Sequence, residues 1–252
     1  MKLFYFTASG NCLSVAKKLG GELYSIPKVL NEGPFSFEDE KIGIIFPCYV
    51  ASTPTIVKEF LEKVELKSDY FFGILTYGKT SGGALDHFKE IAKKNGIEMS
   101  YLNSLLMVDN SIKYYDMDQQ IRDQHTKKID ENIDMIISDI KSKRKYKKTS
   151  NFLMRHISSF GHRMYNKEVG DYDKKFTVES HCNGCGVCQR VCPVNNIQVN
   201  GHPEFKHKCI RCYACTHNCP QNAIRLKGEK SRSRFRNENV QLKEIIEANN
   251  QA

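Results

Sequence analysis

The sequence predicts an α/β protein that consists of a doubly wound parallel sheet followed by a smaller α+β domain. Over residues 1–146, short apolar runs alternate with segments whose apolar residues have helical spacing. A second region, residues 176–228, contains eight of the ten cysteines. A length of 252 residues has room for one large domain and one small domain.

Five apolar runs are predicted to be strands, because a strand covered on both faces reads as a nearly continuous apolar run. They cover residues 2–6, 22–26, 41–46, 70–75 and 99–107. Helices are predicted between them. A long helix is predicted over 119–143, where isoleucines recur on one side.

The first strand runs into a loop with hydroxyl groups and a glycine at the start of a helix. The residues singled out there are Thr7, Ser9, Gly10, Asn11 and Cys12. Hydroxyls and backbone N–H groups that converge at a helix N-terminus favour an anion such as phosphate. The loop matches neither the GxGxxG nor the GxxxxGK[ST] pattern. An ordinary strand-to-helix connection is the alternative for this loop alone.

Two further loops follow the third and fourth strands, at the carboxyl edge where doubly wound sheets bind ligands. The residues singled out in them are Pro47, Tyr49, Thr76, Tyr77, Gly78, Gly82 and Gly83. Tyr49 is expected to stack on or edge a flat ring, and a plain surface tyrosine is the alternative. Glycines allow close approach of the backbone to a flat ligand.

These three loops resemble, in their order, the flavin loops of flavodoxins and of flavodoxin-like quinone and FMN reductases. Thr7-x-Ser9-Gly10-Asn11 resembles the phosphate loop, and Pro47-x-Tyr49 resembles the second loop. The resemblance implies FMN as the cofactor and a five-stranded sheet of order 2-1-3-4-5. Flavodoxins usually have Thr or Ser where this chain has Cys12, and a thiol is a weak donor. One phosphate contact is therefore expected to be lost or left to the backbone.

The cysteines form two runs of one pattern, C-x2-C-x2-C-x3-C-P, offset by 27 residues. They are Cys182, Cys185, Cys188 and Cys192, then Cys209, Cys212, Cys215 and Cys219. This duplication is the ligand pattern of bacterial two-cluster [4Fe–4S] ferredoxins, in which the fourth cysteine of each run binds the other cluster.

We therefore expect two [4Fe–4S] clusters with crossed ligand sets. One set is Cys182, Cys185, Cys188 and Cys219, and the other is Cys209, Cys212, Cys215 and Cys192. A zinc ribbon fits less well, because tetrahedral zinc has no use for the third CxxC step and the Cys-Pro. A disulfide framework fits less well still, because we find no secretory signal and expect a reducing cytoplasm.

The remaining segments are predicted from charge and periodicity. Residues 147–175 are expected to be a basic, partly helical connector that joins the two domains or the two subunits of a dimer, with a membrane-surface helix as the alternative. Residues 229–252 are expected to be a charged tail with a short helix over 241–248. The net charge is +9. The basic run Lys141–Lys148 ends a predicted helix, so it is not expected to bind nucleic acid. No stretch has the length of a transmembrane segment.

As a whole, the chain resembles a family in which a flavodoxin-like domain is fused to a two-cluster ferredoxin. This resemblance implies electron transfer between the clusters and FMN, with other redox proteins as partners. Two alternatives stay open: an FMN-dependent reductase of a small molecule such as a quinone, and a redox-sensing or assembly module. No catalytic acid or base is predicted. His181, His207 and His217 are expected at the surface, without a carboxylate partner.

Overall fold

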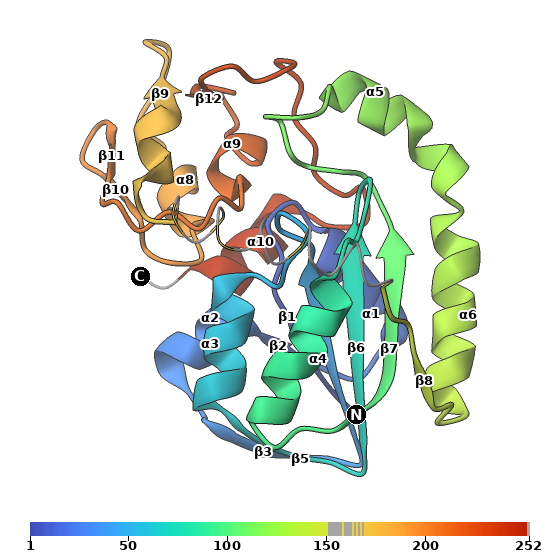
Figure 1. Ribbon diagram of the computed structural model, residues 1–252. Helices are drawn as coiled ribbons and strands as arrows, with labels where there is room; N and C mark the ends of the chain where they lie inside the picture. The colour runs from blue at the N-terminus through green and yellow to red at the C-terminus, as the bar shows by residue number, and fades with distance from the viewer. Residues whose placement is uncertain (151–157, 159–162, 164, 166, 168, 251–252) are drawn as a thin grey trace.

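The computed structural model describes residues 1–150, 158, 163, 165, 167 and 169–250. A six-stranded parallel sheet forms its centre, in the order β2-β1-β4-β6-β7-β8 (Figure 1). The strands are β1 (Lys2–Tyr5), β2 (Glu22–Ser25), β4 (Lys41–Pro47), β6 (Tyr70–Tyr77), β7 (Met99–Leu106) and β8 (Tyr146–Lys147). The predicted order 2-1-3-4-5 is confirmed, and the short β8 adds a sixth strand at the edge.

Helices cover both faces of the sheet (Figure 1). They are α1 (Asn11–Leu19), α2 (Ile26–Glu32), α3 (Thr55–Lys63), α4 (Ala84–Lys94) and α6 (Ile129–Lys141). The helices α2, α3 and α4 pack beside one another, and α1 packs beside α6. A separate two-stranded parallel sheet, β3 (Ser36–Glu38) with β5 (Glu65–Lys67), was not predicted.

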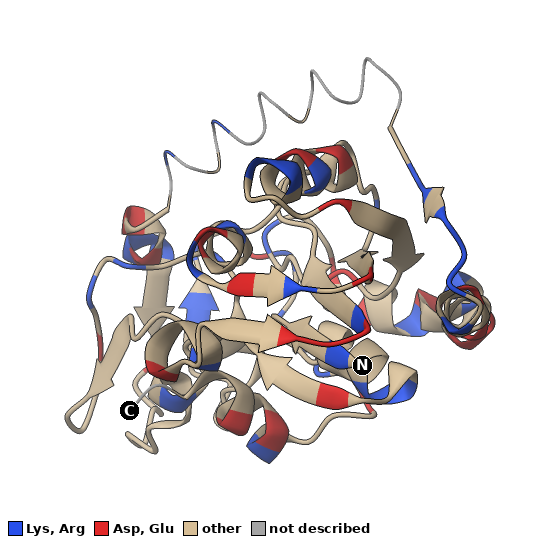
Figure 2. Ribbon diagram, turned by 90° about the horizontal axis from the view of Figure 1, so that it is seen from below, with Lys and Arg blue, Asp and Glu red and all other residues tan. Residues whose placement is uncertain are grey.

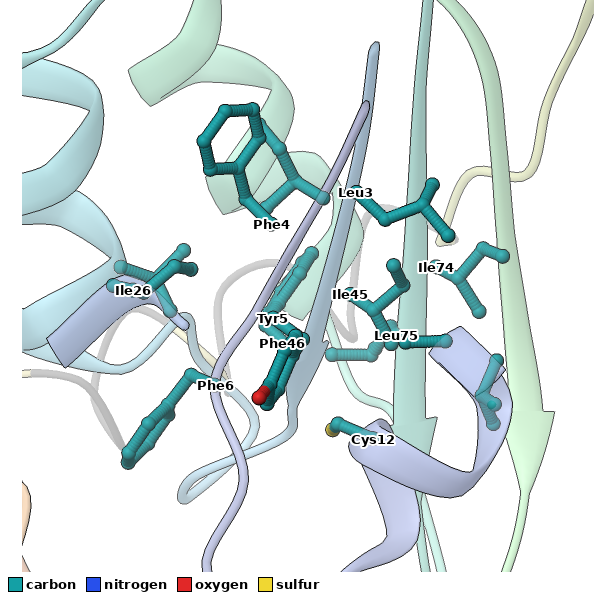
Figure 3. Close-up of a cluster of buried hydrophobic side chains, with 14 of the residues drawn as sticks. Leu3, Phe4, Tyr5, Phe6, Cys12, Ile26, Ile45, Phe46, Ile74 and Leu75 are labelled. Carbon is teal, nitrogen blue, oxygen red and sulfur yellow. The ribbon is translucent and has the colours of Figure 1, made fainter. Parts of the chain in front are cut away.

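The core of this domain is rich in phenylalanine. Phe4 and Phe60 lie with ring centroids 4.9 Å apart, and Phe46 and Phe88 with centroids 4.3 Å apart. All four are fully buried, and part of the cluster is drawn in Figure 3. Burying each such ring contributes about 1.5–3 kcal/mol to stability, so the continuous apolar strands supply much of the driving force.

The prediction of one helix over 119–143 is wrong. The chain forms α5 (Met117–Arg122), a 3-10 turn over Asp123–Lys127, and then α6. Lys128 between them has a left-handed φ of 48°. Thr126 donates its hydroxyl to the carbonyl of Asp123 at 2.7 Å. Such local bonds compete with a continuous helix, which the isoleucine spacing alone did not reveal.

The cysteine-rich part consists of two similar halves. Its elements are η2 (Asp171–Lys175), β9 (Phe176–Val178), α8 (Val187–Arg190), β10 (Ile197–Val199), β11 (Pro203–Phe205), α9 (Ala214–His217) and β12 (Ile224–Leu226). The strands pair as the antiparallel β9–β12 and β10–β11. The sequence repeat reappears in the backbone, because Asn195 and Asn222 have φ values of 49° and 51°.

The C-terminal segment packs against both parts. Residues 229–241 form neither helix nor strand, yet Phe235 and Val240 are buried. The helix α10 (Leu242–Asn249) follows, and a capping box between Gln241 and Glu244 fixes its start. In Figure 1, α10 lies between the sheet domain and the part that carries α8 and α9.

Basic and acidic residues are interspersed along the chain (Figure 2). Within the basic run, Lys143 lies 2.6 Å from Glu40 and Arg144 lies 3.0 Å from Asp139. The apolar stripe predicted for the connector, Leu153, Ile157, Phe160 and Met164, lies outside the described residues. Among the described helices, none has the length and apolar character needed to cross a membrane.

Candidate functional site

Two adjoining cavities lie at the carboxyl ends of the parallel strands. The inner cavity has an empty volume of about 410 Å³ and the outer cavity about 790 Å³. Both are lined by Cys48, Tyr49, Gly78, Asp109 and Asn110. The two cavities therefore adjoin, at the edge of the sheet where doubly wound proteins bind ligands.

Most of the residues singled out in the three loops meet in the inner cavity. Those that line it are Thr7, Ser9, Asn11, Cys12, Pro47, Tyr49, Thr76, Tyr77 and Gly78. Gly10 caps α1 with a left-handed φ of 99°. Gly82 and Gly83 are not among the residues that line either cavity. The N–H of Gly82 bonds to Thr80 Oγ1, and that of Gly83 bonds to Ser158 Oγ.

The loop Thr7–Cys12, named here the phosphate loop, suits an anion. The hydroxyl of Thr7 is buried and has no hydrogen-bond partner among the described residues. It lines the inner cavity at the N-terminus of α1, where the helix dipole favours negative charge. A buried polar atom without a partner usually marks a missing ligand or water. The loop thus fits the phosphate group of FMN.

Cys12 does not leave its thiol free for such a ligand. Its sulfur lies 3.2 Å from Thr76 Oγ1, and the residue belongs to the buried cluster of Figure 3. Burial raises the pKa of the thiol to about 12, while the Thr76 hydroxyl lowers it by a smaller amount. The thiol is therefore neutral, and it ties the first loop to the end of β6.

A fourth loop, Val108–Ser111, was not singled out in the sequence although it completes the site. Asp109 and Asn110 line both cavities. Asn110 Nδ2 donates to Ser9 Oγ at 3.1 Å, and Asn11 Nδ2 donates to the Val108 carbonyl at 2.9 Å. The loop follows β7, so its position at the carboxyl end of a parallel strand was the available signal. Burial raises the pKa of Asp109.

The second loop has an unusual backbone. Val50 and Ala51 have left-handed φ values of 48° and 58°, and Tyr49 and Ser52 exchange two backbone hydrogen bonds of 3.0 and 2.9 Å. This tight turn places Tyr49 in the walls of both cavities. The ring lies 6.2 Å from that of Tyr165, at 60° to it. Tyr49 thus forms a fixed aromatic wall.

The first predicted set of cluster ligands surrounds a cavity of its own, with an empty volume of about 300 Å³. Its walls include Cys182, Cys185, Cys188 and Cys219. Burial raises the pKa of Cys188 to about 12, and the other three thiols of this set raise it further. A cubane takes one thiolate at each of its four irons, and the four cysteines that line this cavity match that ligand set.

The second predicted set is more deeply buried. Burial raises the pKa of Cys212, and the nearby Cys192 and Cys209 raise it further. The same three cysteines act on Cys215. Backbone N–H groups point at the sulfurs in both halves of the repeat: Asn196 N lies 3.2 Å from Cys192 Sγ, and Ala223 N lies 3.3 Å from Cys219 Sγ. Such bonds stabilise thiolate ligands.

The loop of the second set also forms a wall of the outer cavity. Arg211 and Tyr213, on either side of Cys212, line that cavity. The Arg211 guanidinium lies 4.4 Å from the centroid of the Tyr172 ring, and the hydroxyls of Tyr172 and Tyr213 are 2.8 Å apart. Neither residue was singled out in the sequence, because only the packing of the two domains brings them to the cavity.

His217 forms a second contact between the cysteine-rich part and the sheet domain. The prediction that it lies at the surface is wrong. The side chain is buried in α9, between the sheet domain and the C-terminal segment. Its Nδ1 accepts from the N–H of Phe235 at 3.0 Å, so Nε2 carries the proton and donates to the Asn110 carbonyl at 2.7 Å. Burial lowers its pKa to about 4. His207 contradicts the prediction that no histidine pairs with a carboxylate, since its Nδ1 lies 2.7 Å from Asp173 Oδ1.

The comparisons with known proteins agree with the cysteine pattern. A model of the 4Fe-4S binding domain matches residues 176–198 and 205–225. Among solved structures, the chain is similar to a flavoprotein in complex with FMN from Lactobacillus acidophilus NCFM. That likeness has 14% identity and a TM-score of 0.31, and it covers 49% of this chain and 97% of the other. A comparison with curated proteins found no match.

The assignment of each part rests on a separate observation. The matched repeats and the paired N–H to sulfur contacts define the cysteine-rich part. The strand order 2-1-3-4-5, with the site at its carboxyl edge, is that of the flavodoxin-like fold. The chain therefore joins a flavodoxin-like α/β domain to a 4Fe-4S binding domain.

Proposed function

We propose that this protein transfers electrons between two [4Fe–4S] clusters and one FMN held in the same chain. The observation that carries the proposal is the shared wall of the outer cavity. Arg211 and Tyr213 flank the ligand Cys212, and they line the same space as Tyr49, Gly78 and Asp109 of the flavin loops. A cluster on Cys212 would therefore lie close to a flavin ring in that cavity.

The two kinds of cofactor supply complementary chemistry, since a cluster exchanges one electron and FMN exchanges one or two. The chain's own residues supply position. The phosphate loop would hold the FMN phosphate through the Thr7 hydroxyl and backbone N–H groups. Tyr49, Gly78 and Asp109 would enclose the ring system. The two crossed cysteine sets would hold the clusters.

Burial suggests an order for the transfer. Cys185 of the first set is exposed, whereas Cys212 and Cys215 of the second set are buried. The first cluster would thus be the one that a redox protein partner reaches. The second would connect it to the flavin. The many thiols must stay reduced to bind iron, which favours a reducing compartment such as the cytoplasm.

The proposal is tested by purifying the protein without oxygen and measuring its iron, sulfide and FMN. We expect about eight iron atoms per chain, as two cubanes require, together with one bound FMN. Zinc in place of iron would refute the cluster assignment. Iron without bound FMN, even after incubation with an excess of FMN, would refute the flavin site.

A second candidate is reduction of a small molecule at FMN. The outer cavity is open beyond the flavin loops, where Tyr114 is 58% exposed at its rim. A flat acceptor such as a quinone could reach the ring there. Stoichiometric reduction of a soluble quinone by the pre-reduced protein would support this candidate. If only redox proteins oxidise the reduced protein, electron transfer between proteins remains the proposed function.

A further inference from the structure

Three consecutive carbonyl groups of the phosphate loop are held by asparagines from the C-terminal third of the chain. Asn249 Nδ2 donates to the Thr7 carbonyl at 3.0 Å, Asn218 Nδ2 donates to the Ala8 carbonyl at 3.0 Å, and the backbone N–H of Asn237 donates to the Ser9 carbonyl at 2.8 Å. The three asparagines come from α10, from the end of α9, and from the segment between them. They are named here the asparagine clamp.

The clamp fixes which way the peptide groups of the loop point. In a trans peptide, the carbonyl of one residue and the N–H of the next point in opposite directions. Because the carbonyls of residues 7–9 are turned towards the C-terminal third, the N–H groups of residues 8–10 are turned away from it. Successive N–H groups on one side of a loop form an anion-binding concavity. The loop lines the inner cavity, where the Thr7 hydroxyl also lacks a partner among the described residues.

The clamp residues are themselves held firmly. Asn249 is fully buried and also donates to the carbonyl of Val191 at 3.3 Å, and Asn218 is 2% exposed and also donates to that of Ala214 at 3.0 Å. Asn237 donates through its side chain to Asn11 Oδ1 at 3.1 Å. Two of the residues in these contacts are next to cluster ligands in the sequence, because Asn218 precedes Cys219 and Val191 precedes Cys192.

We propose that Asn218, Asn237 and Asn249 are positioning residues for the phosphate of FMN. The ferredoxin-like repeats and the C-terminal segment then form part of the flavin site. The sheet domain by itself does not hold the phosphate loop in the conformation that binds the phosphate. This inference rests on the proposed function, since it requires that FMN binds at the inner cavity. It adds that the affinity for the phosphate group depends on residues outside the flavodoxin-like domain.

The test compares FMN with riboflavin, which has the same ring system and lacks the phosphate. The variants N218A and N249A each remove one side chain of the clamp from the full, cluster-loaded protein. The dissociation constants of both flavins are measured without oxygen by quenching of flavin fluorescence, after the bound flavin has been removed. Iron content shows whether each variant is folded, and either variant that retains its iron is sufficient for the test.

We expect the FMN dissociation constant to rise about tenfold or more in N218A and N249A, the scale of one lost hydrogen bond in a charged site. The riboflavin constant should change less than about twofold. The control N95A removes a similar bond, from Asn95 Nδ2 to the Ile91 carbonyl at 2.9 Å in α4, and should leave both constants unchanged.

Two results would overturn the clamp while leaving the proposed function in place. One is wild-type FMN affinity in iron-replete N218A or N249A. The other is an equal loss of affinity for FMN and riboflavin, which would show a general structural role. Failure of the wild-type protein to bind either flavin would instead refute the proposed function, and the clamp with it.

Discussion

Replacing Gly78 by alanine should disturb the flavin site more than it disturbs the fold. Gly78 follows β6 and lines both cavities. A methyl group there would overlap the Asp109 side chain at its Cβ, Cγ and Oδ2 atoms. Asp109 cannot swing away freely, because Oδ1 accepts from the N–H of Ser111 at 2.8 Å and its own N–H donates to Gln120 Oε1 at 3.2 Å. The fourth loop must therefore shift as a unit.

The size of the effect follows from that geometry. Adding a methyl group to a well-packed site costs about 1–3 kcal/mol. If the shifted loop returns to its place when FMN binds, that cost appears in the affinity, as a roughly 5- to 150-fold higher dissociation constant. Fluorescence titration of the folded, anaerobic protein measures it. Unchanged FMN affinity in G78A would refute the placement of the ring beside Asp109.

The same strand supplies a matched control. At Gly73 a methyl group would lie 2.7 Å from Leu102 Cδ2 and 2.8 Å from Phe88 Cε1, in the core and away from the cavities. The variant G73A should lose stability by overpacking, again by about 1–3 kcal/mol. Its folded fraction should bind FMN as the wild type does. Equal losses of affinity in G73A and G78A would show that the effect is general.

Three further predictions concern charge, burial and metal. Because burial raises the pKa of Asp109, the folded protein binds a proton there more readily than the unfolded chain does. The stability of the protein therefore falls as the pH rises from the pKa of Asp109 in the unfolded chain to its raised pKa in the folded protein. The variant D109N should therefore unfold at a higher temperature than the wild type at pH 7, with a difference that shrinks towards pH 4; an equal or lower midpoint at pH 7 would contradict this. The variant H217A leaves the Phe235 N–H and the Asn110 carbonyl without their partner. It should lower the free energy of unfolding, measured by urea titration, by about 1–3 kcal/mol. An unchanged urea midpoint would contradict the role of His217 in joining the two parts. Removing iron with a chelator should release FMN, as measured by gel filtration. The reason is that the ligands Cys192 and Cys219 directly follow Val191 and Asn218, which take part in the contacts of the asparagine clamp. Full retention of FMN would contradict this coupling.

Local patterns in the sequence were sufficient to predict five of the six strands of the main sheet. Strands buried on both faces are apolar along their length, so runs such as residues 41–46 and 70–75 can be recognised as strands from the sequence. The break at Lys128 was invisible because isoleucine spacing continues across it. The pair β3–β5 was also missed, since each strand has three residues and its pattern reads Ser-Phe-Glu or Glu-Leu-Lys.

The site was predicted as far as it depends on single loops. The hydroxyl-rich first loop and the cysteine repeats could be identified from residue types at fixed spacing. His217 and the asparagine clamp could not be found in this way. A polar residue such as Asn249 resembles any surface asparagine until tertiary packing buries it against Thr7. The residues that join the two domains are therefore those that required the structure.

Electron transfer between the clusters and the flavin inside one chain can be measured directly. The clusters of the anaerobic, FMN-loaded protein are reduced by a rapid one-electron donor, and flavin absorbance is followed in a stopped-flow instrument. We expect first-order flavin reduction whose rate constant does not change on tenfold dilution of the protein. A rate that falls in proportion to dilution, or no flavin reduction with both cofactors bound, would contradict it.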